Sequence, residues 1–153
     1  LGCNLGMFYK RRDYTRVVNG RNPIVAHEYL GDSVEGKTVF IADDIIASGE
    51  SMLEVASNLK ARGAKRIIAD ATFPLFTSGL DKFDKAVEEG TLDYVVGTNL
   101  TYRKPELLNR DWYVDVDVSK YAAYFIVALN HDMSVSSIID PIKKIEALLA
   151  SRK

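Results

Sequence analysis

The residues best suited to chemistry stand together between Val39 and Ser51, where an apolar run leads into two acids and a small polar turn. The run from Val39 to Ala42 is typical of a short buried strand, and a helical pattern follows the turn. Backbone N–H groups at the start of such a helix favour phosphate. Adjacent carboxylates at Asp43 and Asp44 repel one another unless hydroxyls, amides or a cation share their charge. This pattern predicts a site for a phosphorylated, polyhydroxylated ligand such as a sugar phosphate, although an acid-rich turn with a capping serine would look similar.

The elements that must position these residues alternate along the chain between strand and helix. Apolar residues at helical spacing follow the turn until Gly63, and Arg66 to Ala71 then has the character of a strand. The remaining patterns predict strands at 5–9, 24–30, 94–99 and 112–116 and helices at 80–89, 119–130 and from 140 onward. The segment 24–30 is expected to neighbour 37–42 across the Glu35-Gly36 turn, as a hairpin or as adjacent strands. This alternation predicts one α/β domain over residues 1–153, with a mostly parallel sheet.

Ligands of parallel sheets bind beyond the carboxyl ends of the strands, and three polar groups are predicted to lie there. Besides Asp43-Asp44, these are Thr72-Phe73-Pro74 and Thr98-Asn99. The last pair could instead be a strand cap. No Gly-x-x-x-x-Gly-Lys-Ser/Thr loop is present, so a nucleotide site of that kind is excluded.

Composition narrows the classes of partner. The formal net charge is −1 and charged residues make up 27% of the chain, so nothing calls for nucleic acid or a membrane surface. The single cysteine, Cys3, cannot form an intrachain disulfide, which favours a reducing cytoplasm. His27 has no second ligand at metal spacing and is expected to be an ordinary strand residue, so no metal site is predicted from these residues.

The stretch from Asp43 to Ser51 resembles the ribose-phosphate-binding motif of the type I phosphoribosyltransferase superfamily, in which two acids and two aliphatic residues precede a small-residue phosphate loop. Flanking groups are similar, in order, to the C-terminal half of the ribose-phosphate pyrophosphokinases. These groups are Lys10-Arg11-Arg12, Gly31-Asp32, Gly36-Lys37, Gly63-Ala64-Lys65 and Ser134-Val135-Ser136-Ser137. The resemblance runs from about Leu1 to Ile139. It implies a phosphoribosyltransferase-like sheet flanked by helices, and we expect the chain to be the C-terminal half of a longer protein.

The resemblance also implies an activity, the transfer of a diphosphate from ATP to the 1-hydroxyl of ribose 5-phosphate, with Mg²⁺ shielding the phosphates. Asp43 and Asp44 would hold the ribose hydroxyls. Lys10 and Arg12 would open a mobile loop and stabilise charge on the transferred group. The 5-phosphate would be wrapped by Ala47, Ser48, Gly49, Glu50 and Ser51. Ligands for ATP and Mg²⁺ are expected outside this chain, in a preceding half and a neighbouring subunit, which implies a homo-oligomer.

Three departures from the synthetase pattern keep other functions open. Many synthetases have an acid-threonine pair in place of Ala47-Ser48, a glycine in place of Glu50 and a histidine in place of Phe73. Ala47-Ser48 is more similar to the loop of some base phosphoribosyltransferases, so a transferase that consumes phosphoribosyl pyrophosphate is one alternative. A non-catalytic, synthetase-like regulatory subunit is another. A carboxylate about 4 Å from a phosphate would cost on the order of 4 kcal/mol, so Glu50 is expected to point outward.

Overall fold

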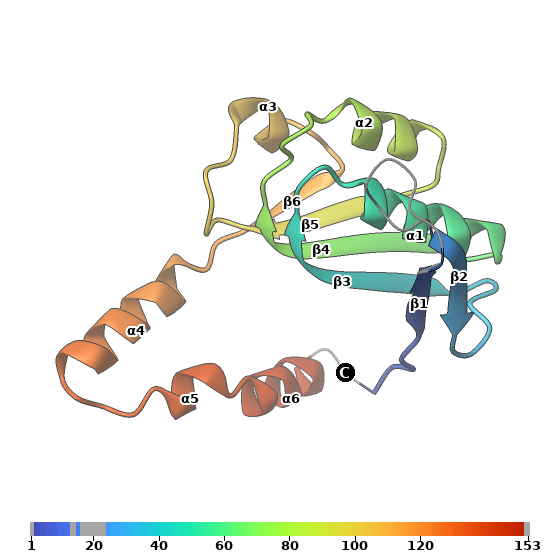
Figure 1. Ribbon diagram of the computed structural model, residues 1–153. Coiled ribbons are helices and arrows are strands. Elements are labelled where there is room, and N and C mark those ends of the chain that lie inside the picture. The colour runs from blue at the N-terminus through green and yellow to red at the C-terminus, as the bar shows by residue number, and fades with distance from the viewer. Residues whose placement is uncertain (1, 13–14, 16–23, 152–153) are drawn as a thin grey trace.

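A four-stranded parallel sheet forms the centre of the computed structural model, which describes residues 2–12, 15 and 24–151 (Figure 1). Its strands lie side by side in chain order, β3-β4-β5-β6, and a helix connects each strand to the next. The elements of this unit are β3 (Thr38–Ile46), α1 (Glu50–Ala61), β4 (Arg66–Pro74), α2 (Asp81–Glu88), β5 (Tyr94–Thr98), α3 (Pro105–Leu108) and β6 (Tyr113–Val116). The predicted α/β fold with a parallel sheet is therefore confirmed.

Helices α1 and α2 cover one face of the sheet (Figure 1). The buried side of α1 presents Met52, Ala56 and Leu59, the helical spacing that the sequence predicted. Alternate residues of β4 meet them, and Ile67 and Ala69 are fully buried. The helix ends before Gly63, whose φ of 84° lies in the left-handed region that favours glycine.

An aromatic cluster fills the space between α2, the β4–α2 loop and β6. The rings of Phe76 and Phe83 meet edge to face with centroids 4.9 Å apart, and Phe83 stacks on Trp112 at 5.9 Å. Tyr113 closes the cluster, 6.2 Å from Phe76. Burial raises the pKa of the Tyr113 hydroxyl to about 12. This cluster fixes the loop that follows β4, which matters for the site described below.

Strands β1 (Met7–Arg12) and β2 (Ile24–Leu30) form a separate antiparallel hairpin. Two predictions are corrected here. Strand β2 pairs with β1, in the register Phe8 with Tyr29, and not with the strand that contains residues 37–42. Lys10 and Arg12 belong to β1 itself and do not follow it, because the hairpin pairing continues to Arg12 opposite Ile24.

The other face of the sheet is only partly covered in the described part of the chain. Phe40 is 58% exposed and Val114 43%, and the helices α4 (Ser119–Asn130), α5 (Ser136–Ile139) and α6 (Ile142–Ala150) run away from β6 as an arm (Figure 1). None of the helices in the described ranges is long and apolar enough to cross a membrane. The sequence predicted α4 and α6, but α3 and α5 are single turns too short to show a periodicity.

Candidate sugar-phosphate site

The two predicted acids lie near the end of β3. The strand continues past Asp43 and Asp44 to Ile46, which pairs with Pro74 of β4, so the acids stand inside the strand and not beyond it. Consecutive strand residues project to opposite faces. Both residues are exposed, and an Asp43 carboxylate oxygen accepts a hydrogen bond from the Asp44 amide at 2.8 Å. The two carboxylates therefore leave the strand on different sides. Both are exposed, and a single ligand can contact both at the edge of the sheet, which β3 forms.

The predicted phosphate loop spans the turn from Ala47 to the start of α1. Gly49 is the residue that precedes the helix, with a φ of 77°. The first helical hydrogen bond runs from the Leu53 amide to the Gly49 carbonyl at 2.9 Å, so the amides of Ser51 and Met52 come before the helical ladder. Amides at this position, together with the helix dipole, form an anion-binding geometry.

Three residues that sequence reasoning missed shape this loop. Phe83 of α2 lies directly against Gly49, where a Cβ would overlap its ring. The β4–α2 loop supports the other side, because the amides of Phe76 and Thr77 donate hydrogen bonds to the carbonyls of Ile46 at 3.0 Å and Ala47 at 2.9 Å. These contacts join segments about 30 residues apart, and no local pattern could have indicated them.

Glu50, the residue least compatible with a phosphate, has a partner on α2. Its carboxylate accepts a hydrogen bond from the Lys82 ammonium at 2.6 Å, and both side chains are more than half exposed. Lys82 holds the pKa of Glu50 below its usual range through this hydrogen bond and its charge. The structure thus supplies a cation that offsets the negative charge beside the loop.

The third predicted group, Thr98-Asn99, forms hydrogen bonds with other residues of the fold. The Thr98 hydroxyl donates to the Thr72 carbonyl at 2.6 Å. The Asn99 side chain accepts from the Val118 amide at 2.9 Å and donates to Asp117 at 2.6 Å, so it holds the start of α4. This is the strand-cap role that the sequence had left as an alternative.

No described contact brings the predicted catalytic residues Lys10 and Arg12 to the phosphate loop, and their side chains lie outside the described part. Tyr29 of the same hairpin lies under the Arg62 guanidinium at 5.3 Å, at the far end of α1 from Gly49. Most of the loop after Arg12 also lies outside the described residues. The role of this hairpin in chemistry stays a prediction.

The candidate site offers a metal ion two side-chain ligands, the carboxylates of Asp43 and Asp44. Within the described ranges, no group of three or more His, Cys, Asp or Glu residues could hold a metal ion. Mg²⁺ is commonly bound by one or two carboxylates together with substrate phosphates, so Asp43 and Asp44 fit a metal that arrives with a ligand better than a resident one.

Comparison with known families decides what this arrangement belongs to. A family model described as phosphoribosyl transferase domain matches residues 1–121, which is most of the chain. The chain belongs to this family. The match covers the hairpin, the whole parallel sheet and the predicted phosphate loop. It confirms the resemblance that the motif from Asp43 to Ser51 suggested.

Individual relatives have names that are more specific than the name of the family. The chain is 31% identical over 140 residues to a ribose-phosphate pyrophosphokinase of Thermotoga maritima, covering 90% of this chain and 40% of that protein. For the ribose-phosphate pyrophosphokinase of Shewanella oneidensis the identity is 29% over 135 residues, covering 88% and 40%. The chain therefore spans about 40% of the length of these relatives.

A solved structure confirms the fold class. The phosphoribosylpyrophosphate synthetase from Mycobacterium smegmatis superposes with a TM-score of 0.60 at 22% sequence identity. The superposition covers 70% of this chain and 34% of the synthetase chain. At this identity the likeness bears on the arrangement of strands and helices, which is the α/β arrangement predicted from the sequence.

Proposed function

We propose that this chain is the ribose 5-phosphate-binding part of a ribose-phosphate diphosphokinase, which transfers a diphosphate from ATP to ribose 5-phosphate and forms phosphoribosyl pyrophosphate for nucleotide biosynthesis. The observation that carries the proposal is the loop at the start of α1. Its Gly49 backbone is left-handed, its amides precede the helical ladder, and two exposed acids stand just before it. A sugar phosphate matches both parts of this site, because its phosphate suits the loop amides and its hydroxyls suit the two acids.

Each half of the site has a role in the proposal. The 5-phosphate binds to the loop from Ala47 to Ser51 through backbone amides and the hydroxyls of Ser48 and Ser51. Asp43 and Asp44 accept hydrogen bonds from the ribose hydroxyls and so orient the 1-hydroxyl for attack on the β-phosphorus of ATP. Such a transfer needs positioning and charge stabilisation more than covalent chemistry from the protein.

The remaining components come from elsewhere in the proposal. Mg²⁺ bound with ATP would shield the phosphate charge, and most of its ligands would lie outside this chain. Lys10 and Arg12 stabilise the group in transfer once the hairpin meets the bound nucleotide. The assembly is a homo-oligomer in the cytoplasm. Leu5 is 92% exposed and Met7 57%, which supports further contacts at this end of the chain.

Calorimetry on the purified chain tests the binding step. Ribose 5-phosphate should bind, ribose should bind far more weakly, and Asp43→Ala with Asp44→Ala should lose binding while the thermal transition of the protein stays in place. With ATP and Mg²⁺ added, the chain alone should release no AMP at the rate of about 1 per second typical of kinases. A folded chain without affinity for ribose 5-phosphate contradicts the proposal.

A chimera tests the transfer step. The Thermotoga maritima relative would receive this chain in place of the 40% of its length that the chain matches. We expect formation of phosphoribosyl pyrophosphate and AMP in equal amounts from ATP and ribose 5-phosphate, and none from the chimera with both acids changed to alanine. A chimera that binds ribose 5-phosphate but never turns over would instead favour a regulatory subunit.

A further inference from the structure

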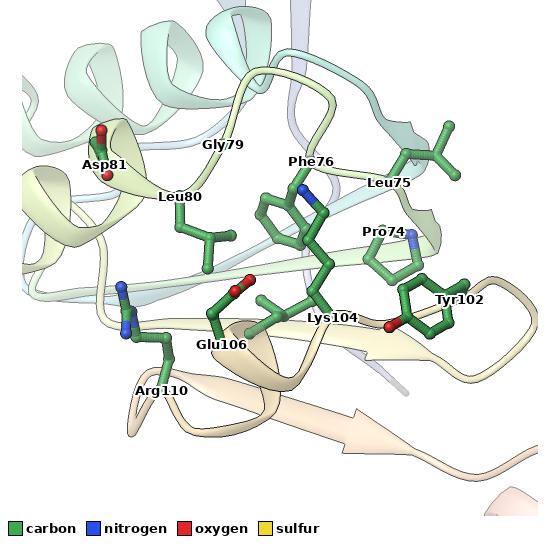
Figure 2. A pocket seen from close by; sticks show the side chains of 11 residues that line it. Pro74, Leu75, Phe76, Gly79, Leu80, Asp81, Tyr102, Lys104, Glu106 and Arg110 are labelled. Carbon is green, nitrogen blue, oxygen red and sulfur yellow. The ribbon is translucent and has the colours of Figure 1, made fainter.

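A cavity lies between the β4–α2 loop and the segment from Tyr102 to Arg110, and none of its lining residues belongs to the predicted phosphate loop (Figure 2). Its volume is about 290 Å³. The floor is apolar, since Pro74 and Leu107 are buried and Phe76 is only 5% exposed. A cavity of about 150 Å³ is enough to hold benzene, so this one has room for a ring that carries a substituent.

The charges around the cavity are divided between its two ends. At one end Arg110 is fully engaged, because its guanidinium donates to both carboxylate oxygens of Asp84, with a closest distance of 2.8 Å. The hydrogen bond and charge of Asp84 raise the pKa of Arg110, and the nearby charges of Asp81 and Glu106 raise it further. This end is therefore acidic overall and has no cation free for an anionic ligand.

Lys104, at the other end of the cavity, is not paired as Arg110 is in the described part of the chain. Within the described residues its ammonium forms no ion pair or hydrogen bond, and Figure 2 shows its side chain extending across the cavity towards Phe76. Lys104 is exposed, so an anion that pairs with its ammonium beside the apolar floor gains a modest attraction of the size usual for surface ion pairs. Lys104 therefore defines where an anionic group would lie.

Tyr102 supplies a flat surface beside this cation. Its side chain is 81% exposed at the rim, next to Pro74, and its hydroxyl turns towards Lys104 (Figure 2). An exposed aromatic ring next to a proline can stack with another ring. The ring and the cation belong to the same segment, two residues apart, so one ligand can meet both.

We propose that this cavity binds a flat aromatic molecule with one anionic group, a carboxylate or a phosphate. The ring lies between Tyr102, Pro74 and Leu107, and the anion meets the Lys104 ammonium, away from the acids around Arg110. None of these residues belongs to the phosphate loop, so the proposal does not depend on binding of ribose 5-phosphate.

Amide chemical shifts of the ¹⁵N-labelled chain test this site residue by residue. Benzoate and phenyl phosphate are the two anionic probes, and benzyl alcohol is the neutral one. We expect saturable shifts for the amides of residues 75–80, 102–104, 106 and 107, with dissociation constants of about 1 mM for probes of this size. Benzyl alcohol should bind about fivefold more weakly than benzoate, the difference that one partly exposed ion pair makes. The stronger of the two anions identifies the natural class of anionic group.

Three variants sharpen the result. Lys104→Gln should weaken benzoate binding about fivefold and leave benzyl alcohol unchanged, whereas Tyr102→Ala should weaken both. Lys37→Gln, on an exposed lysine near the start of β3, should change neither. Trp112 is the one tryptophan of the chain and packs 6.1 Å from Phe76, so its fluorescence reports that each variant keeps the local packing. Absence of saturable shifts at these amides, shifts confined to the open sheet face, or unchanged affinity in Lys104→Gln would overturn the proposal.

Discussion

Gly49 lies against the ring of Phe83 so closely that a Cβ on Gly49 would overlap the Cε2 and Cζ atoms of that ring. The φ of 77° at Gly49 adds a second restriction, because L side chains rarely adopt it. The ring in turn stacks on Trp112 and meets Phe76, so it cannot easily yield. The conformation of the phosphate loop is therefore set by the aromatic cluster behind it as much as by its own sequence.

Gly49→Ala is expected to lower the free energy of unfolding by about 2–4 kcal/mol, the sum of left-handed strain and overpacking. It should also abolish binding of ribose 5-phosphate, because the loop must move to relieve the overlap. Urea unfolding and calorimetry measure the two effects.

A matched control separates strain from overlap. Gly90 has a similar φ of 69°, but a Cβ there would meet nothing within 4 Å, so Gly90→Ala should cost only about 1–2 kcal/mol and leave binding intact. Replacing the ring as well, in Gly49→Ala with Phe83→Leu, should recover part of the lost stability relative to the sum of the single variants. Strict additivity would show that Phe83 does not restrict Gly49.

The carboxylate of Asp84 joins α2 to the segment between α3 and β6. It accepts hydrogen bonds from Arg110 and, at 2.7 Å, from the Trp112 indole. The Arg110 hydrogen bond holds the pKa of Asp84 below its ordinary value of 3.8. A depressed carboxyl pKa contributes stability that is present above about pH 4 and is lost as pH falls through the folded-state pKa.

Asp84→Asn should therefore lower stability at pH 7 by about 1–2 kcal/mol, a modest value because both partners are partly exposed. Its stability should also fall less steeply than that of the parent as pH drops below 4. Urea midpoints from pH 7 to pH 3, followed by Trp112 fluorescence, measure both. Asp111→Asn, at an exposed residue nearby, should keep the parent's pH dependence. Parallel curves for Asp84→Asn and the parent would contradict the assignment.

The strands and helices of the parallel sheet were predictable because each buries one regular face. The pattern of Met52, Ala56 and Leu59 located α1, and the apolar run before Asp43 located β3. The run did not locate the end of β3, because acids are rare inside strands and only pairing with β4 carries the strand to Ile46. At Asp43 and Asp44 the pairing with β4 therefore outweighs the low strand propensity of aspartate.

The hairpin and the supports of the loop were harder to predict for the same reason. The sequence of a strand such as 24–30 does not indicate which strand it pairs with. Here it pairs with the preceding strand, β1, and not with the following one. The contacts of Gly49 with Phe83 and of Glu50 with Lys82 depend on how α2 packs beside α1. Sequence reasoning could state that Glu50 needs relief from a phosphate, but it could not name the lysine that provides it.

Lys82 is expected to matter for binding only through Glu50. Lys82→Gln would leave the Glu50 carboxylate unpaired beside the phosphate loop, and the affinity for ribose 5-phosphate should fall about threefold to tenfold. Glu50→Gln alone should change affinity less than tenfold, under about 1.4 kcal/mol. The double variant should bind about as well as Glu50→Gln, because a neutral amide side chain at position 50 has no need of a cation. If Lys82→Gln lowers affinity equally in both backgrounds, Lys82 contacts the ligand itself.

Lys10 is expected to act on transfer more than on binding of the sugar. The proposed function places it on the diphosphate, a group that ribose 5-phosphate lacks. In the chimera described above, Lys10→Ala should lower turnover more than about a hundredfold while the Michaelis constant for ribose 5-phosphate changes little, the behaviour of an interaction made only in the transition state. Lys37→Gln is the matched loss of one exposed cation and should leave turnover unchanged. Steady-state rates at saturating and limiting ribose 5-phosphate measure both constants. A Lys10→Ala chimera with weakened sugar binding and unchanged turnover would instead place Lys10 at the ribose 5-phosphate site, and the hairpin would then belong to binding and not to transfer.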